Sequence, residues 1–432
     1  MFEILKTTRT GRQVLRTATK TLGSASVVAA LFGFAGGLGV AQTAGSLDPT
    51  FGTGGIVMQN GLFEGQNVMP LTAIEQPGGD IVVILGINNI VATEAFGLVR
   101  FTSEGKLDTT FGTKGVTMVT FTDFINEPNS VAVQPDGDIV VVGFSETTSG
   151  GFNFAMARFT PNGQLDDTFG NGGLVTVQPP GIQPSAMVVM VQPNGQIIEG
   201  GSVIGINNET PGGTVLGRFN SDGSLDTTFG TNGFAVATTA VGAPTGLALL
   251  ANGSYLALGN FARVVEFSST GVLQSTVTAD TVVTTSRPGQ AFANPVVFQP
   301  SGDFIEGQLV GEGHGDANTD DQIVRFSETG VVIPSFDTTA FAFPGVSMND
   351  PQTLALQSNG QILVSGVPFG LARLNTNGEL DTTFGTSGTV ETPGGQVTGL
   401  LIQTDGKIVA IGSEPPNGLV SEHLMLARYL AN

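Results

Sequence analysis

Short apolar runs separated by polar turns recur along most of the chain. Typical runs are SVAVQ (130–134) and DIVVVG (138–143), which are rich in β-branched residues and flank an Asp-Gly turn. Runs of this length, bounded by such turns, are typical of β-strands in hairpins. Beyond the N-terminal leader, no segment shows a helical period with capping residues. The pattern therefore predicts an all-β protein.

The apolar–turn–apolar phrase occurs seven times, and a third apolar segment such as AMARF (155–159) follows each copy. The turn glycines are Gly79, Gly137, Gly195, Gly253, Gly302, Gly360 and Gly406, separated by 58, 58, 58, 49, 58 and 46 residues. Self-similarity at such a period is typical of solenoids and propellers. Seven units of about four short strands each match a propeller, in which one sheet per repeat surrounds an axis. A β-helix would have shorter, evenly stacked coils, and a sandwich would not repeat seven times.

Another phrase, G-x-L-D-x-T-F-G, occurs five times, for example as GSLDTTFGTNG (223–233). The copies contain Asp48 and Phe51, Asp108 and Phe111, Asp166 and Phe169, Asp226 and Phe229, and Asp381 and Phe384. We interpret the Asp as an acceptor for backbone N–H groups two residues on, assisted by the Thr. The Phe would fill the gap between neighbouring repeats, and the Gly would supply a positive φ. The alternative is that the five Asp residues are metal or ligand sites.

One repeat position holds most of the positive charge outside the leader. Six arginines occupy it: Arg100, Arg158, Arg218, Arg325, Arg373 and Arg428. The Asp of the G-x-L-D phrase eight residues downstream is the expected partner, since a guanidinium can hydrogen-bond a carboxylate through two donors. In the fourth unit Glu266 replaces the Arg and Gln274 replaces the Asp. In the fifth unit Arg325 remains although Ile333 replaces the Asp.

The combination of G-x-L-D-x-T-F-G with QPDGDIVVVG (134–143) and ARF (157–159) resembles the delta-60 repeat family. The resemblance spans residues 45–432 and is weak over 261–345. It implies a β-propeller of a bacterial secreted protein with no established activity. The amino-acid sequence of the strands also resembles that of the NHL type of propeller.

These resemblances imply an order of strands within each blade. SVAVQ would be the inner strand, DIVVVG the second, FAMARF (154–159) the third and LVTVQ (174–178) the outer strand. The first G-x-L-D phrase then precedes any inner strand, and the chain ends at LARYLAN without an outer strand for the seventh unit. We therefore expect GIVMQ (55–59) to complete the seventh blade. The prediction is one seven-bladed β-propeller of four-stranded blades over residues 46–432, closed by an N-terminal strand.

The N-terminal segment has a different character. Residues 1–23 carry five basic side chains, and the small apolar run SVVAALFGFAGGLGVA (26–41) follows. This is typical of a secretory signal peptide over residues 1–41, cleaved near Gln42. The apolar run is shorter than the roughly 18 residues of a membrane-spanning helix. The alternative is an uncleaved N-terminal anchor. We expect a secreted, periplasmic or cell-surface protein, with no transmembrane segment in the mature chain.

The charge of the mature chain narrows the possible partners. The leader contains five of the 16 basic residues and one of the 36 acidic residues, so 11 basic and 35 acidic residues remain. Such a chain repels phosphate backbones, which argues against nucleic acid and in favour of a cation or a basic partner. The chain has no Cys, which excludes disulfides and Cys-based metal sites. We expect a monomer.

Candidate catalytic residues are scarce. Only two histidines occur, His314 and His423, and P-loop and HExxH motifs are absent. The loop 312–322 places Asp316, Asn318 and Asp320 at the spacing of the first half of a calcium loop. Asp321 stands where such a loop needs Gly, and Ser327 where it needs Glu. The three residues are a candidate Ca²⁺ site, and the alternative is a solvated acidic loop.

The sequence thus favours a non-catalytic binding or scaffold propeller. The alternative is a calcium-dependent hydrolase or lyase that acts in the central channel. In the implied strand order, many acidic residues share one rim with a single clear basic residue, Arg287, and form an acidic loop face. These acidic residues are Glu64, Glu94, Asp123, Glu127, Glu146, Glu209, Asp280, Glu312, Asp316, Asp320, Asp321, Asp350, Glu391, Glu414 and Glu422. We expect this face to bind a protein, a cation or a small ligand, and its charge favours a cation or a basic partner. The alternative is that the charge only keeps a secreted protein soluble.

Overall fold

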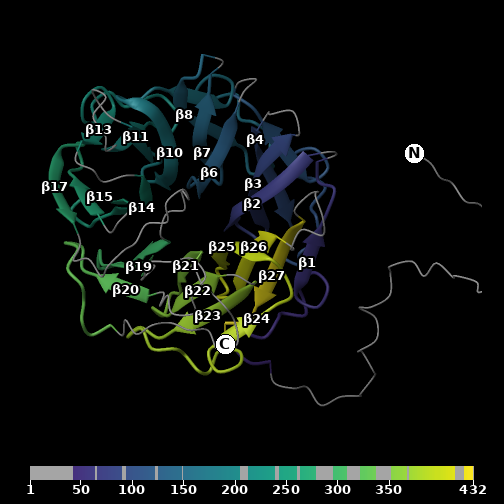
Figure 1. Ribbon diagram of the computed structural model, residues 1–432. Helices are drawn as coiled ribbons and strands as arrows, with labels where there is room; N and C mark the ends of the chain where they lie inside the picture. The colour runs from purple at the N-terminus through teal and green to yellow at the C-terminus, as the bar shows by residue number, and fades with distance from the viewer. Residues whose placement is uncertain are drawn as a thin grey trace, which may run out of the picture. The chain divides into compact units, whose positions relative to one another are not determined.

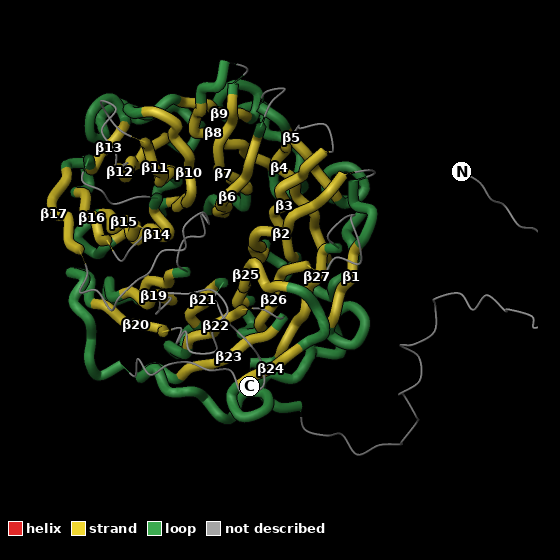
Figure 2. Tube along the Cα trace, in the orientation of Figure 1, coloured by secondary structure: helices red, strands yellow, loops and turns green. Residues whose placement is uncertain are grey.

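The computed structural model shows seven antiparallel sheets arranged as blades of a ring (Figure 1). It describes residues 42–63, 66–89, 94–121, 125–147, 149–204, 213–238, 243–259, 263–278, 295–308, 322–336, 352–366, 369–413 and 423–431. The predicted leader, residues 1–41, lies outside these ranges. Strands and loops account for the described part, in which no helix is drawn (Figure 2). No helix able to span a membrane is found in this part of the chain.

Six blades have four strands each, and three strands are described in the fifth. Blade 1 contains β2 (Gln66–Glu75), β3 (Ile81–Asn89), β4 (Glu94–Phe101) and β5 (Val116–Val119). Blade 2 contains β6 (Asn126–Val133), β7 (Ile139–Glu146), β8 (Phe152–Phe159) and β9 (Leu174–Val177). Blade 3 contains β10 (Ile182–Val191), β11 (Ile197–Ile204), β12 (Gly213–Phe219) and β13 (Phe234–Ala237). Blade 4 contains β14 (Pro244–Leu249), β15 (Tyr255–Gly259), β16 (Arg263–Phe267) and β17 (Leu273–Thr278).

The remaining blades follow the same order. Blade 5 contains β18 (Val296–Phe298), β19 (Phe304–Gln308) and β20 (Gln322–Phe326). Blade 6 contains β21 (Thr353–Leu356), β22 (Ile362–Gly366), β23 (Gly370–Leu374) and β24 (Thr389–Glu391). Blade 7 contains β25 (Gln396–Ile402), β26 (Ile408–Ser413), β27 (Leu424–Tyr429) and β1 (Ile56–Gln59). The implied order of inner, second, third and outer strands is therefore confirmed.

The N-terminal strand closes the ring. β1 pairs antiparallel with β27 in the register Ile56↔Ala427 to Gln59↔Leu424, and β2 then begins blade 1. Figure 1 shows β1 beside β27 at the meeting of the two ends of the described chain. This pairing covers the edge of β27, which would otherwise present unpaired backbone groups. The predicted closure is confirmed.

The hydrophobic core lies between the blades rather than within one layer. Seven clusters of buried side chains are found, one at each joint between neighbouring blades. Successive residues of a strand alternate between the two faces of its blade. Thus Val82 in β3 packs toward blade 2, whereas Val83 packs toward blade 7. The second and third strands are covered on both faces, which explains their continuous apolar sequences.

The hairpin turn of each blade needs glycine. Gly79, Gly137, Gly195, Gly253, Gly302, Gly360 and Gly406 all have φ between 84° and 94°. L-residues with a Cβ rarely adopt this conformation. The recurrence of Gly at this one position is therefore a requirement of the backbone.

Candidate functional site

The G-x-L-D-x-T-F-G phrase and the three residues that follow it form a turn, which we call the cap, between the third strand of a blade and its outer strand. The Asp Oδ1 accepts hydrogen bonds from the backbone N–H of the Thr two residues later, at 2.9–3.1 Å, and from its Oγ1, at 2.6–2.7 Å. The predicted role of the Asp and the Thr is confirmed in all five copies.

The arginine of the third strand binds the second oxygen of the same Asp. Its Nε donates to Asp Oδ2 at 2.7–2.9 Å. The pairs are Arg100–Asp108, Arg158–Asp166, Arg218–Asp226, Arg373–Asp381 and Arg428–Asp48. The first four confirm the predicted spacing of eight residues. The last pair joins the two ends of the described chain, because residues 45–55 supply the cap that belongs to β27.

Each of these arginines also reaches the next blade. Its Nη1 donates to a backbone carbonyl in the turn after the neighbour's third strand, as from Arg100 to Pro161 O at 2.8 Å and from Arg218 to Ser269 O at 2.7 Å. The corresponding acceptors of Arg158, Arg373 and Arg428 are Ser221 O, Ala431 O and Ser103 O. We call this assembly of Arg, Asp, Thr and Phe the inter-blade clamp.

The phenylalanine of the cap lies beneath the guanidinium. The five rings are 4.4–4.8 Å from the Arg Cζ, at a distance typical of cation–π contacts. Each ring is fully buried. A Cβ on Gly163 of blade 2 would lie 2.5 Å from the ring of Phe111 in blade 1, so only glycine fits against it. The predicted filling of the gap between blades is confirmed.

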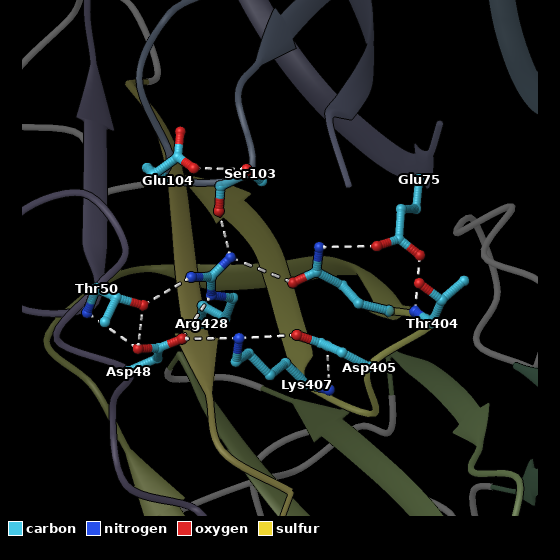
Figure 3. A network of polar contacts seen from close by, with 10 residues as sticks. Asp48, Thr50, Glu75, Ser103, Glu104, Thr404, Asp405, Lys407 and Arg428 are labelled. Atoms are coloured by element: carbon cyan, nitrogen blue, oxygen red, sulfur yellow. Dashed lines mark hydrogen bonds and ion pairs between the residues drawn. The ribbon is translucent and has the colours of Figure 1, made fainter. Parts of the chain in front are cut away.

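The joint that closes the ring carries additional polar contacts (Figure 3). Arg428 binds Asp48, and its Nη2 donates to Thr50 Oγ1 at 3.1 Å. Lys407 Nζ lies 3.6 Å from Asp48 Oδ2 and 2.7 Å from Asp405 Oδ2. From the blade 1 side of the joint, Glu75 accepts a hydrogen bond from Thr404 N of blade 7 at 2.7 Å. Blades 7 and 1 therefore bind each other through charged groups contributed by both.

The clamp alters the protonation of its carboxylates. Burial raises the pKa of Asp48, but the hydrogen bonds from Thr50 and the Arg428 guanidinium outweigh burial and hold the pKa below its ordinary value. The same balance lowers the pKa of Asp108, Asp166 and Asp381. For Asp226 the hydrogen bond from Thr228 is the largest influence, and its pKa is also lowered. These are the properties of structural ion pairs rather than of acids poised near neutrality.

Two joints depart from this pattern. In blade 4, Glu266 and Gln274 replace the Arg and the Asp, so no clamp pair is possible. In blade 5, Arg325 binds Asp303, which directly precedes the adjacent strand β19, through Nη2 at 2.8 Å. Its Nε has no hydrogen-bond partner among the described residues. Both departures occur where the sequence lacks the Asp of the G-x-L-D phrase. The eight-residue spacing did not predict Asp303 as the partner of Arg325.

The predicted calcium ligands, Asp316, Asn318 and Asp320, lie outside the described residues, as do His314 and Arg287. Within the described ranges, no group of three or more His, Asp or Glu side chains could hold a metal ion. Of the acidic loop face, Glu94, Glu127, Glu146 and Glu391 fall in described strands, and the other members lie outside them.

The inner strands determine what chemistry could face the axis. Across the described β2, β6, β10, β14, β18, β21 and β25, the only titratable residues are Glu75 and Glu127. Glu75 is engaged with Gln403 and Thr404 of blade 7. These strands therefore offer no converging acid, base and nucleophile of the kind that hydrolysis needs.

Glu199 is a buried carboxyl that sequence reasoning missed. It lies on β11 with 1% of its surface exposed, and Oε1 has no hydrogen-bond partner in the described part of the chain. Burial raises the pKa of its carboxyl well above the ordinary value. Gly217 stands opposite it on β12. The signal was the replacement of Val, found at this position in blades 1, 2 and 6, by Glu within an otherwise apolar strand.

A comparison with protein families agrees with the propeller fold. Residues 134–169, 192–229 and 357–384 match a family described as "Domain of unknown function (DUF5122) beta-propeller". Each matched segment runs from the hairpin turn to the Phe of the cap in blades 2, 3 and 6. No curated protein matches the chain.

Solved structures of low sequence identity align with most of the chain. The WD40 beta propeller domain of Doa1 aligns at 12% identity and a TM-score of 0.49, covering 87% of this chain and 96% of that domain. A protein of unknown function from Bacteroides caccae aligns at 13% identity and a TM-score of 0.39, covering 76% of this chain and all of that protein. The C-terminal WD40 domain of Sif2 aligns at 10% identity and a TM-score of 0.45, covering 83% of this chain and 81% of that domain.

Proposed function

We propose that this chain is a non-catalytic propeller of the delta-60 repeat type that acts outside the cytoplasm and binds a cationic or basic partner on its acidic loop face. The observation that carries the proposal is that the charged residues of the repeated phrase bind one another rather than a ligand. All five Asp–Arg pairs are engaged in clamps between blades, at the end of the strands where the caps lie. The motif that dominates the sequence therefore builds the ring, and a ligand must be bound elsewhere.

The opposite end of the strands supports the binding role. The loops there join second to third strands and outer to inner strands, and the acidic residues of the acidic loop face stand in or beside these loops in the sequence. Loops carried by a rigid ring commonly supply binding residues. Like charges on one face add, and their field attracts cations and basic surfaces. The delta-60 resemblance and the predicted leader, residues 1–41, support a location outside the cytoplasm.

The test compares two variants with the same change of net charge. In the loop-face variant Asp316, Asp320 and Asp321 become Asn; in the cap-face variant Glu104→Gln, Asp136→Asn and Asp167→Asn alter exposed residues beside the caps. Each purified protein is titrated with oligolysine at two salt concentrations. We expect the loop-face variant to lose most of the affinity and the cap-face variant to keep it. Equal losses would show that net charge alone attracts the probe and would overturn the proposal.

The candidate Ca²⁺ site is tested separately. A ligand that binds only the folded protein stabilises it by about 2.7 kcal/mol at 100 times its Kd. We expect millimolar calcium to raise the melting temperature of the intact chain but not of Asp316→Ala. An unchanged melt in both proteins rejects the calcium site and leaves only solubility as the role of this loop's charge.

The location is tested by mass. We expect the protein isolated from the bacterial envelope or medium to begin near Gln42. Retention of Met1 in a membrane fraction would replace secretion by anchoring.

A further inference from the structure

Nine Asn-Gly pairs occur in the sequence, an unusual number for one chain of 432 residues. In such a pair, the backbone nitrogen of the Gly can attack the side-chain carbonyl carbon of the Asn. The new C–N bond closes a five-membered succinimide, and ammonia leaves. Water then opens the ring at either carbonyl and yields Asp or isoaspartate. The reaction needs no enzyme and no reactant besides water.

The structure divides these pairs into two classes. Eight of them are described, and in six the glycine N–H donates a hydrogen bond of 2.8–2.9 Å to a backbone carbonyl: Asn162-Gly163, Asn194-Gly195, Asn232-Gly233, Asn252-Gly253, Asn359-Gly360 and Asn377-Gly378. A nitrogen held in this way is turned toward its acceptor and must be released before it can attack.

Several protected asparagines are also held by their own side chains. Asn194 Oδ1 accepts a hydrogen bond from Gln196 N at 3.0 Å. Asn359 Oδ1 accepts one from Gln361 N at 3.0 Å, and Asn252 Oδ1 accepts one from Ser254 N at 2.8 Å. Both reacting groups are thereby fixed, so that closure of the succinimide requires the hairpin turn to open.

Asn60-Gly61 and Asn171-Gly172 differ from the six other described pairs in the glycine N–H, which donates no hydrogen bond among the described residues. No hydrogen bond to Gly61 N, Gly172 N or either Asn side-chain amide is found among the described residues. Asn60 and Asn171 are both exposed. The two glycines have φ of 64° and 63°, and a Cβ on either would meet nothing within 4 Å. The chain has room to rearrange at these two positions.

We propose that Asn60 and Asn171 are sites of spontaneous modification, converting to aspartate and isoaspartate while the other described Asn-Gly pairs are protected by the fold. Both positions matter to the ring. Asn171 lies in the cap of blade 2, where its N–H donates to Leu174 O, and Asn60 directly follows the closing strand β1. Isoaspartate lengthens the backbone by one carbon, so conversion at either site loosens an inter-blade joint as the protein ages.

The experiment incubates the purified full chain at mildly alkaline pH and measures deamidation at each pair by peptide mapping, with isoaspartate detected by methyltransferase labelling. We expect Asn60 and Asn171 to convert about tenfold faster than Asn194, Asn252 and Asn359, since each hydrogen bond that must first open lowers the reactive population by roughly that factor. In the urea-unfolded chain all pairs should react at similar rates.

A matched control is Asn171→Thr, because Thr stands at this position in four other caps as Thr53, Thr113, Thr231 and Thr386. This variant should fold normally and lose only the modification at 171, while Asn60 continues to react. Equal rates at all Asn-Gly pairs of the folded protein, or faster reaction at Asn194 than at Asn171, would overturn the proposal.

Discussion

Five joints of the ring carry the inter-blade clamp, and the joints on the two sides of blade 5 do not. Where the clamp is present, both members of each ion pair are nearly buried, as in Arg373 and Asp381, whose side chains are 5% and 7% exposed. The Arg325–Asp303 pair of blade 5 is 25% and 19% exposed. Both residues belong to one blade, since Asp303 directly precedes β19 and Arg325 lies on β20, so the pair contributes nothing across a joint.

The same contrast appears in apolar packing. Gly115 of the cap in blade 1 lies against Leu107. Blade 4 lacks the phrase that would form this cap, and the equivalent Leu273 is 41% exposed. Leu165 in the clamped blade 2 is 36% exposed, so this position differs little and the contrast lies in the residue before it. Val272 and Val331, 56% and 53% exposed, stand where clamped blades place Lys106, Gln164, Ser224 or Glu379. The comparison teaches that the repeated phrase encodes a contact between blades, so its loss identifies the weak joints directly from the sequence.

The largest expected effect is at the closing joint. Deleting residues 46–60 removes β1, Asp48 and Phe51, and leaves Arg428 buried without its carboxylate. Truncating a buried Phe alone costs about 3–5 kcal/mol, a large share of the 5–15 kcal/mol that stabilises a domain. We expect the truncated chain to unfold far below the melting temperature of the intact chain, as measured by calorimetry.

A control keeps this result interpretable if the truncated chain does not fold. Phe51→Ala retains β1 and should be destabilised by an intermediate amount, and a peptide of residues 42–60 should partly restore the truncated chain. If truncated and intact chains melt alike, closure by β1 is not important for stability.

The next prediction compares one clamped and one unclamped arginine. Arg158→Ala leaves Asp166 buried and unpaired, and breaking a buried pair in this way costs about 3–5 kcal/mol. Arg325→Ala removes the same charge from a more exposed pair, for which the cost is about 0–1 kcal/mol. Unfolding in urea measures both. Equal losses of stability would show that the clamps are not what distinguishes the five clamped joints from the two joints of blade 5.

The sequence predicted the blades, the closure, the Asp–Thr turn, the buried Phe and four of the five Arg–Asp pairs by spacing, because each depends on local residues that recur. It did not predict that Nη1 of Arg158 reaches Ser221 O in the next blade, since that contact depends on how neighbouring sheets are staggered. Gln76, Gln134 and Gln403 accept hydrogen bonds from clamp arginines. Their signal, a Gln three residues before six of the seven turn glycines, was present in the repeated phrase but has no partner until the blades are assembled.

A smaller effect is expected from pH. Clamp carboxylates have a lowered pKa, so their contribution to stability is present above the ordinary value of 3.8 and is lost as pH falls below it. Glu199 has the opposite sign: its pKa is raised, so the protein loses stability as pH rises above 4.5. We expect the free energy of unfolding to be greatest in mild acid. Glu199→Gln should flatten only the decline above pH 4.5. If the decline is unchanged, Glu199 is not its cause.

The smallest effect distinguishes the caps from one another. Their penultimate position has φ between 53° and 65°, and it is Gly in two of them, Gly54 and Gly172, but Lys114, Asn232 and Ser387 in the others. For a residue with a Cβ, this left-handed conformation costs roughly 1–2 kcal/mol of conformational energy, and Asn adopts it more readily than Lys or Ser. We therefore expect Lys114→Gly to stabilise the protein by about 0.5–1 kcal/mol, because relief of strain is partly offset by the greater freedom of Gly in the unfolded chain. Asn232→Gly should change little. Lys114→Ala, which removes the charge but keeps the Cβ, is the control, and an equal gain from it would assign the effect to charge rather than to the backbone.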